Sequence, residues 1–116
     1  MPRNISFSMT TPQFLDKSKM VTRRLGWWAL KPGDVLCGVE KARGLKKGEK
    51  IRRLGLIKIV SVRRERLNAI TAVDVTNEGY PDMWPGEFVK MFCRAHKCKP
   101  EAWVNRIEFR YLEGAE

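Results

Sequence analysis

The last part of the chain contains the pattern that most restricts its fold. From residue 104 to 112 the side chains alternate, so that Ile107, Phe109 and Tyr111 fall on one face and charged residues on the other. A repeat of two residues is the periodicity of a β-strand with one buried and one solvent-facing side. The segment 104–112 is therefore predicted to be a strand that covers a core with one face.

Three further segments have the composition of strands. Ile5–Met9 alternates apolar and polar residues, and Val35–Val39 follows the turn sequence Lys31–Asp34, where proline and glycine favour a tight corner. Leu54–Val62 is apolar on nearly both faces and rich in β-branched residues. This last pattern predicts a central strand that is covered on both sides.

Two stretches favour helices. The first begins at Thr10–Pro12 and runs to Asp16, with a threonine as the candidate cap. In the second, residues 84–95, apolar side chains recur at helical spacing, with Asp82 as a candidate cap and Pro100 beyond its end. Because strands and helices do not alternate regularly, the order predicts an α+β fold around a small β-barrel rather than a doubly wound sheet.

The length and composition fit one domain. The 116 residues suffice for a compact unit and are too few for two ordinary ones, so a single domain is expected over residues 1–116. No apolar run approaches the roughly 20 residues that span a bilayer, and the amino terminus lacks the apolar stretch of a signal peptide. The three cysteines, an odd number, fit reduced thiols. We expect a cytoplasmic, monomeric protein without membrane association.

The net charge of +10 is distributed unevenly. Between residues 41 and 66 two glutamates face a run of cations, namely Lys41, Arg43, Lys46, Lys47, Lys50, Arg52, Arg53, Lys58, Arg63, Arg64 and Arg66. Such a concentration is typical of a polyanion-binding surface, and residues 46, 47, 52, 53, 63, 64 and 66 are the candidates for phosphate contacts. The glycine-punctuated stretch 42–50 is expected to be an exposed loop. A solvated, highly charged loop without a partner is the alternative.

A second polar group lies in the hexapeptide Lys-Met-Val-Thr-Arg-Arg. Lys19, Thr22, Arg23 and Arg24 combine an amine, a hydroxyl and fixed positive charge, which can bind a phosphate or a base edge. Alternatively, a desolvated Lys19 with a lowered pKa can take the proton of the Thr22 hydroxyl. Because these residue types are common on surfaces, the motif by itself does not separate a site from an ordinary surface.

Together with other short segments, this motif resembles the ASCH domains, a branch of the PUA-like superfamily. The matching pieces are Ile5–Ser8, Lys19–Arg24, Lys31–Leu36, Glu78–Tyr80, Glu87–Phe88 in the following helix, and Ile107–Phe109. They keep the family's order over almost the whole chain. Similar small stand-alone proteins are often encoded by bacteria and phages. The resemblance implies a PUA-like β-barrel with flanking helices and a cleft beneath the first helix.

The resemblance also implies a set of site residues. The family's cleft carries a Lys-x-x-Thr-x-Arg motif and the acidic residue of a Glu-Gly segment, which match Lys19, Thr22, Arg24 and Glu78. The family is generally proposed to bind RNA, and some bacterial members are amidohydrolases acting on N4-acetylcytidine. In those enzymes the matching threonine is the proposed nucleophile, the lysine its activating base and the glutamate a supporting acid/base. From the residues alone, Lys19–Glu78 is equally a structural ion pair and Glu78–Gly79 a helix-end turn.

Aromatic residues near these cations are candidates for stacking on bases. Trp27 and Trp28 closely follow the two arginines, and Tyr80 follows the Glu-Gly pair. We count Trp27 and Tyr80 among the binding residues, and expect one of the two adjacent tryptophans to point inward and the other to lie near the cleft. Tryptophan is mostly buried on average, so Trp84 and Trp103 are assigned to the core.

One group of residues has some features of a metal site. Cys93, His96 and Cys98 lie close together, with Cys37 as a remote fourth ligand. The paired cysteines of zinc knuckles are absent and Cys93 falls in the apolar pattern of a helix, so thiols without metal are favoured. The sequence has no phosphate-binding loop or dinucleotide fingerprint. We expect neither a metal nor a cofactor.

The sequence therefore favours a module that binds RNA or another nucleic acid. The cleft would take a base or a modified nucleoside, and the cationic segment would hold the backbone. The alternative is an amidohydrolase acting on an acylated nucleoside such as N4-acetylcytidine, with Thr22 as nucleophile and Lys19 as base. A third interpretation is an interaction protein whose basic loop docks on an acidic partner. Nucleic-acid binding is favoured over nucleoside hydrolysis because a small uncharged nucleoside does not require a cationic segment, whereas a phosphate backbone does.

Overall fold

The computed structural model describes residues 2–42 and 44–113. Its centre is a five-stranded sheet with the strand order β1-β3-β4-β5-β2, in which β1 and β3 are parallel and the other neighbours antiparallel. The strands are β1 (Arg3–Ser6), β2 (Val21–Arg24), β3 (Val35–Val39), β4 (Arg53–Arg66) and β5 (Trp103–Tyr111). The helices are α1 (Thr11–Leu15), α2 (Ala72–Asn77), α3 (Pro85–His96) and the 3-10 turn Leu67–Ala69.

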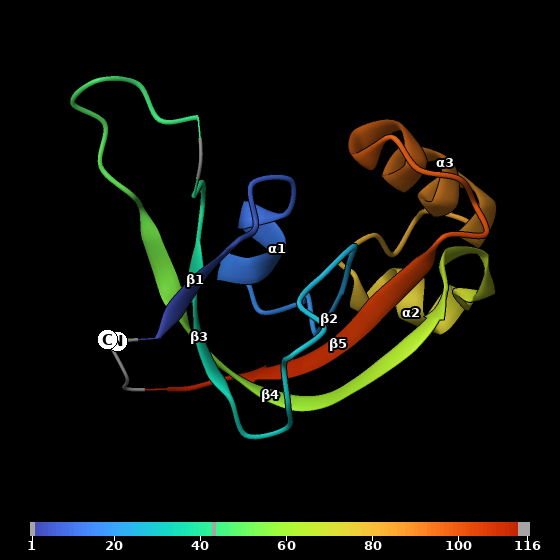
Figure 1. Ribbon diagram of the computed structural model, residues 1–116, viewed down its shortest axis with the longest axis horizontal. Helices are drawn as coiled ribbons and strands as arrows, with labels where there is room; N and C mark the ends of the chain where they lie inside the picture. Colours follow the sequence, from blue (N-terminus) through green and yellow to red (C-terminus); the bar gives the residue numbers. More distant parts are fainter. Residues whose placement is uncertain (1, 43, 114–116) are drawn as a thin grey trace.

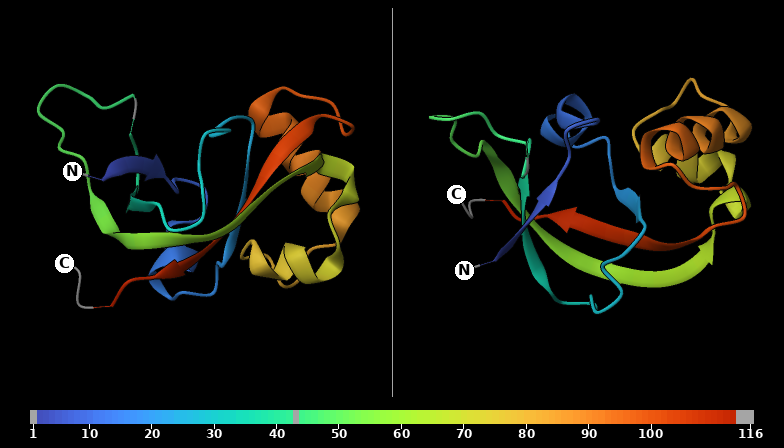
Figure 2. Two further views of the ribbon diagram at one scale, coloured as in Figure 1. Left: turned by 60° about the horizontal axis from the view of Figure 1, so that its bottom comes forward. Right: turned by 45° about the horizontal axis from the view of Figure 1, so that its top comes forward.

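The strands β4 and β5 give the sheet its curvature. Their antiparallel ladder shifts register between Ile59 and Ser61, and such a bulge bends and twists a strand. Figures 1 and 2 show both strands sweeping from the end near β1 and β3 to the end that carries α2 and α3. The curled sheet with a few helices confirms the predicted α+β fold with a small, partly closed barrel.

Two hydrophobic clusters hold the helices on the sheet. In the first, Phe14 of α1 packs against Phe7 and Phe109 of the sheet side, with ring centroids 4.7 and 6.4 Å away. In the second, Phe88 and Phe92 of α3 pack with the 3-10 turn and the start of β5. The two clusters occupy different parts of the sheet, which leaves the region between α1 and α3 for polar side chains.

Most of the predicted elements are confirmed. The strand Val35–Val39 is found as predicted, α1 and α3 agree with the predicted helices to within a residue or two, and β5 has the expected inward and outward faces. The first strand lies earlier in the chain than predicted, at Arg3–Ser6 in place of Ile5–Met9. It ends at Ser6 because a turn follows, in which the Thr10 amide donates to the Phe7 carbonyl, and Met9 is left exposed. None of the described helices is long and apolar enough to cross a membrane.

The cap of α3 differs from the expectation. The helix begins after Trp84 rather than at Asp82, and the Glu87 carboxylate accepts a hydrogen bond of 2.9 Å from the Trp84 amide. An acidic side chain in the first turn that reaches back to the cap amide satisfies a donor that has no partner within the helix. The predicted end of the helix near His96 is confirmed by the left-handed backbone of Lys97.

The central strand β4 is longer than predicted and less covered. It runs to Arg66, so that Arg53, Arg63, Arg64 and Arg66 belong to a strand and not to a loop. Its position in the middle of the sheet is as predicted, but one face meets solvent in places, and Val60 is 44% exposed. The prediction of two covered faces was wrong because the helices pack on only part of the sheet.

Two elements had no periodic signal in the sequence. The edge strand β2 has three polar residues among its four, Thr22, Arg23 and Arg24, and was recognised only as a motif. The helix α2 has six residues and is capped by Thr71, whose side chain accepts from the Asp74 amide. Elements this short are specified by caps and tertiary contacts more than by an amphipathic pattern.

Two tryptophans assigned to the core lie at the surface. Trp84 is 74% exposed because it precedes the first turn of α3 and projects beyond the helix's apolar face. Trp103 is 47% exposed because its neighbour Val104 takes the inward position on β5. Of the two adjacent tryptophans 27 and 28, one was expected to point inward. Trp27 agrees with this expectation, because it packs against the first cluster.

The contact between β3 and α1 yields a stability test. A Cβ added at Gly38 would overlap the Phe14 ring. Overpacking a filled core costs typically 1–3 kcal/mol, so Gly38→Ala is expected to lower the free energy of unfolding by about that amount, measured by urea denaturation. In the control Gly86→Ala the new Cβ meets nothing within 4 Å, and its helical position predicts unchanged or slightly higher stability. Equal stability of the two variants would contradict the described packing.

Candidate functional site

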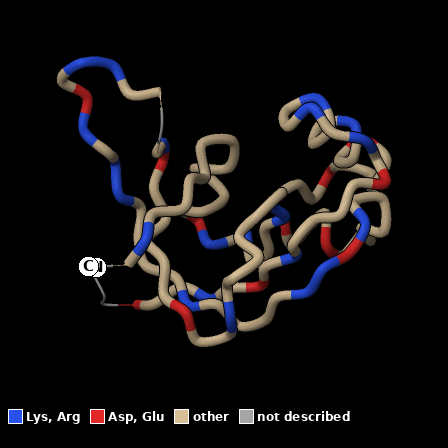
Figure 3. Tube along the Cα trace, viewed as in Figure 1, with Lys and Arg blue, Asp and Glu red and all other residues tan. Residues whose placement is uncertain are grey.

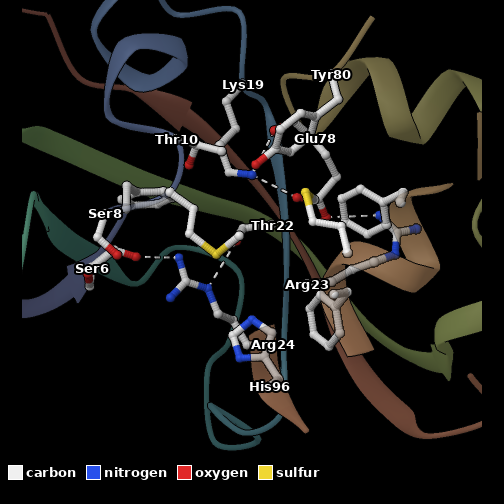
Figure 4. Close-up of a pocket in the computed structure, with 15 residues that line it drawn as sticks. Ser6, Ser8, Thr10, Lys19, Thr22, Arg23, Arg24, Glu78, Tyr80 and His96 are labelled. Atoms are coloured by element: carbon white, nitrogen blue, oxygen red, sulfur yellow. Dashed lines mark hydrogen bonds and ion pairs between the residues drawn. The ribbon is translucent and has the colours of Figure 1, made fainter. Parts of the chain in front are cut away.

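A cavity of about 250 Å³ lies between the two hydrophobic clusters. It is bounded by the end of β1 and the turn before α1, by β2, by the end of α2 and by one face of α3 (Figure 4). Its lining residues are Ser6, Phe7, Ser8, Met9, Thr10, Lys19, Thr22, Arg23, Arg24, Glu78, Tyr80, Phe88, Met91, Phe92 and His96. The cavity thus joins Lys19, Thr22, Arg23, Arg24, Glu78 and Tyr80, which the sequence analysis selected.

The centre of the cavity wall is a buried ion pair. The Lys19 ammonium donates to the Glu78 carboxylate oxygen Oε1 at 2.7 Å and to the Glu78 backbone carbonyl at 2.8 Å (Figure 4). Both residues are 3% exposed. A buried charge without a partner is costly, so each side chain holds the other in place. One N–H of the ammonium is left for a ligand.

Local backbone geometry brings this pair together. Glu78 ends α2, and Gly79 after it has a φ of +105°, in the left-handed region that favours glycine. Gln13 of α1 packs against Gly79 so closely that a Cβ there would lie 2.8 Å from its Cγ. On the other side, the Tyr111 hydroxyl donates to the Lys19 carbonyl at 2.6 Å. Glu78–Gly79 is therefore a helix-end turn and a cavity wall at once, and the two interpretations of it are compatible.

Behind the pair, Arg23 is the hub of a network of charges. Its guanidinium donates to Asp74 at 2.6 Å, to Glu65 at 2.7 Å and to Glu78 at 3.3 Å. These contacts tie β2 to β4, to Asp74 within α2 and to Glu78 at the end of α2. Each carboxylate is shared with a second cation, namely Glu78 with Lys19, Glu65 with Arg63 and Asp74 with Arg106. Sequence reasoning selected Arg23 but missed Glu65, Asp74 and Arg106, which carried no recognisable spacing.

The network fixes the protonation states of its members. Hydrogen bonds from Arg106 and Arg23 hold the pKa of Asp74 well below its usual range, although burial opposes this. Burial tends to lower the pKa of Arg23, but the bonds to Asp74 and Glu65 outweigh it and raise the pKa. Both groups are therefore ionised across the neutral range, and the network is a fixed pattern of charge rather than a proton donor.

Arg24 differs from Arg23 because no carboxylate of the described residues lies within ion-pair distance of it. Its Nε donates to the Thr22 hydroxyl at 3.0 Å and one Nη to the Ser6 carbonyl at 2.6 Å (Figure 4). Burial lowers its pKa to about 10, so the guanidinium is charged at neutral pH. An uncompensated guanidinium at a cavity wall favours a ligand with an anionic or carbonyl oxygen.

Three other titratable groups of the cavity also have shifted pKa values. Burial lowers the pKa of Lys19, and the charge of Glu78 offsets this only in part. Burial and Glu78 raise the pKa of Tyr80, so its hydroxyl stays protonated. Burial, together with the charge of Arg24, lowers the pKa of His96, which keeps its imidazole uncharged. The Tyr80 hydroxyl and the His96 ring can each donate or accept a hydrogen bond.

One wall of the cavity is aromatic. Tyr80 and Phe88 are 5.9 Å apart between ring centroids, and Phe92 and His96 are 4.3 Å apart. The sequence analysis missed Phe88 and Phe92 because their helical spacing indicated a core face, and it considered His96 only as a metal ligand. That assignment holds for part of the face, but the same face of α3 also borders the cavity.

The remaining candidates lie elsewhere. Trp27 does not line the cavity; its ring is covered by Arg3 at 4.4 Å. The cationic segment is not one patch, because Lys46, Lys47 and Arg52 lie in the loop before β4 and Arg53 starts the strand, whereas Arg63, Arg64 and Arg66 lie at its far end. Figure 3 shows these two groups, and a third group of cations near the end of α3. Some ten residues of β4 separate the first two, which is up to roughly 30 Å of strand.

The cysteines do not assemble with the histidine. Within residues 2–42 and 44–113, no group of three or more His, Cys, Asp and Glu side chains is arranged to hold a metal ion. Cys37 is buried in β3, far along the chain from Cys93 and Cys98. The latter two interact, since burial and a hydrogen bond with Cys93 raise the pKa of Cys98. All three thiols are free.

Neither a protein-family model nor a curated protein sequence matches the chain. Solved structures, in contrast, do match the chain in their fold. A DUF984 protein from Enterococcus faecalis matches with a TM-score of 0.68 and 16% identity over 97% of this chain and 77% of that one. An ASCH domain from Lactobacillus crispatus matches with a TM-score of 0.65 and 16% identity over 94% of this chain and 78% of that one. The fold is ASCH-like.

The likeness covers the parts of the chain that build the cavity. The ASCH-like fold agrees with the fold that the family resemblance implied, a small α+β barrel with flanking helices. Both matched chains extend beyond the aligned region, since about a quarter of each has no counterpart here. At 16% identity the likeness concerns the fold alone.

The Arg23 network yields a second stability test. Arg23→Met would leave three buried or half-buried carboxylates without their common cation, and breaking such pairs typically costs about 3–5 kcal/mol. Arg63 is the matched control because it contacts the same Glu65 but is 61% exposed. Arg63→Met is expected to cost no more than about 1 kcal/mol. Urea denaturation of both variants gives the comparison, and similar losses would contradict the hub role of Arg23.

The pH dependence of stability checks the same network independently. The pKa of Asp74 is lowered in the folded state from the ordinary value of 3.8, so its stabilisation is complete above that pH and decreases as the pH falls below it. The unfolding free energy of the wild type is therefore expected to fall more steeply than that of Asp74→Asn between pH 4 and the acid limit of folding. Unfolding free energies that decrease equally steeply with falling pH in the two proteins would contradict the pairing of Asp74 with Arg23 and Arg106.

Proposed function

We propose that the protein binds RNA or another nucleic acid and takes a base, or a modified nucleoside, into the Lys19–Glu78 cavity. The observation that carries this proposal is the combination of fixed donors with an aromatic wall. Lys19 and Arg24 offer N–H groups from one side, the Tyr80 hydroxyl and His96 add groups that donate or accept, and the rings of α3 form an apolar wall. A planar heterocycle with carbonyl and amino edges has the complementary chemistry.

The size of the cavity supports a small ligand. Pockets that enclose drug-sized molecules span roughly 300–1,000 Å³, and this one has about 250 Å³. One nucleobase with part of its sugar suits such a volume better than several nucleotides do. A longer nucleic acid would therefore place a single unit in the cavity and leave its backbone outside.

Cations outside the cavity support the proposal that the ligand has a charged phosphate backbone. The loop between β3 and β4 and the end of α3 both carry lysines and arginines, and α1 lies between them (Figures 2 and 3). The α3 group consists of Lys90, Arg94, Lys97 and Lys99, which the sequence analysis did not single out. Phosphates attract such surfaces without reading sequence, so the cavity would supply the choice of base.

A second candidate function, amide hydrolysis of an acylated nucleoside, has one observation in its favour. Thr22, Lys19 and Glu78 line the same cavity, and Arg24 donates to the Thr22 hydroxyl, where it would stabilise developing negative charge. Against it, the Lys19 ammonium bonds to Glu78, and no hydrogen bond joins it to Thr22. A base that activates Thr22 needs hydrogen-bond contact with it in the reacting complex.

The binding proposal is tested first with nucleosides. N4-acetylcytidine and cytidine are titrated into the protein and heat or fluorescence is followed. Because hydrogen bonds to charged groups contribute about 1.5–3 kcal/mol, Arg24→Met is expected to weaken nucleoside binding about ten-fold or more. Arg110→Met, which removes an exposed arginine from the other end of β5, serves as control. Equal affinities of the two variants would contradict the assigned role of the cavity.

Turnover separates the two candidate functions. N4-acetylcytidine is incubated with the wild type, Thr22→Val and Lys19→Met, and release of cytidine is followed by chromatography. Since Lys19 bonds to Glu78 and not to Thr22, we expect binding without release. Release that disappears in both variants, while their thermal unfolding shows that they are folded, would instead establish the amidohydrolase.

A further inference from the structure

The far end of the sheet has one face that no helix covers. Val104 packs in the cluster with α3, and Glu65 opposite it on β4 turns to the Arg23 network. Because side chains alternate along strands, their neighbours Arg64, Arg66 and Trp103 point to the opposite side. These three side chains are solvent-exposed, although one of them is a large aromatic ring.

Two indole rings and two guanidinium groups are stacked on this face. The Arg64 guanidinium lies 4.5 Å from the Trp28 ring centroid, and that of Arg66 lies 3.9 Å from the Trp103 centroid. Each indole is 47% exposed. Among the described residues, no carboxylate lies within ion-pair distance of Arg64 or Arg66, so two positive charges are left without compensation on a surface that also exposes aromatic rings.

The arrangement is held by backbone contacts. The Asn105 side chain, which lies opposite Arg64 in the ladder, donates to the Trp27 carbonyl at 2.9 Å and fixes the loop that presents Trp28. The Arg66 guanidinium donates to the Glu101 carbonyl at 2.9 Å. The stacks are therefore positioned by the sheet before any partner arrives, which reduces the entropy lost on binding.

We propose that the face formed by Trp28, Arg64, Arg66 and Trp103, here called the Trp–Arg face, binds single-stranded nucleic acid. This inference rests on the proposed function for the class of partner, but it assigns a second surface outside the cavity. Bases would stack on the exposed indoles and guanidinium planes, and the charges of the arginines would meet the phosphates. Aromatic rings interleaved with arginine are the common solution for strands bound without base pairing.

The spacing of the stacks fits a single strand. Arg64 and Arg66 are two residues apart on β4, which corresponds to about 6–7 Å along the strand. Consecutive nucleotides of an extended single strand are separated by a similar distance, so neighbouring bases can use neighbouring stacks. A duplex hides its base faces and gives the indoles nothing to stack on.

A lipid surface fits this face less well. Interfacial anchors combine aromatic rings with a continuous apolar patch that enters the bilayer. Here each indole is covered on one side by a guanidinium, so that a positive charge lies against both rings. The chemistry of the face therefore favours a partner with regularly spaced anions and planar groups.

The experiment measures binding of fluorescein-labelled oligouridine by anisotropy at low salt. The test variants are Trp103→Ala and the double charge removal Arg64→Gln/Arg66→Gln. Trp84→Ala, which removes a more exposed indole from the start of α3, and Arg110→Gln are the controls. Since a base stack contributes about 1–3 kcal/mol, Trp103→Ala should raise the dissociation constant at least about five-fold. In the double arginine variant, the slope of the logarithm of the binding constant against the logarithm of the salt concentration should also become less steep, by the amount that corresponds to about two phosphate contacts.

Each outcome decides the inference. Losses of oligouridine affinity in the Trp–Arg face variants, with Trp84→Ala and Arg110→Gln near the wild-type affinity, support it. Binding that depends on the loop cations or on the cavity but not on Trp103 overturns it and leaves the proposed function standing. Nucleoside binding without any oligouridine binding also overturns it, as does capture by anionic vesicles in place of oligouridine. Failure of both oligouridine and nucleoside to bind overturns the proposed function as well.

Discussion

The structure around the cavity depends on the burial of one arginine. Arg23 is 3% exposed, and a cation at that depth requires carboxylates around it. It obtains them from Glu65 on β4, Asp74 on α2 and Glu78 at the end of α2. The requirement therefore fixes where α2 lies against the sheet. Because Glu78 is shared with Lys19, the same requirement sets the position of the Lys19 ammonium at the cavity wall.

This dependence separates two adjacent arginines by role. Arg23 and Arg24 point to opposite sides of β2, as neighbours on a strand must. The charge of Arg23 is compensated by three carboxylates and acts within the protein. Arg24 has a hydroxyl and a carbonyl as partners and keeps its charge for a ligand. A binding mechanism in which Arg23 and Arg24 both contact the ligand would therefore assign to the ligand the charge of Arg23, which pairs with carboxylates of the protein.

Patterns with a period were readable from the sequence, and contacts between distant segments were not. The alternation in β5 and the helical spacing in α3 specified both elements, since burial of one face dominates their energy. The strand β2 and the helix α2 are too short for such a signal. The Lys19–Glu78 contact joins residues 59 positions apart and was reached through a family resemblance. Trp84 and Trp103 were misassigned because average burial says nothing about which face a particular residue occupies.

The bulge in β4 has a consequence for which chemistry each side of the sheet displays. It occurs between Ile59 and Ser61, before the strand reaches its arginines. In a regular ladder every later residue would be rotated to the other side, because a shift of one position exchanges the two faces. Glu65 would then turn outward and leave Arg23, and Arg64 would turn under the helices. The single extra residue at the bulge thus determines that the Glu65 carboxylate faces the interior and the Arg64 guanidinium faces the surface.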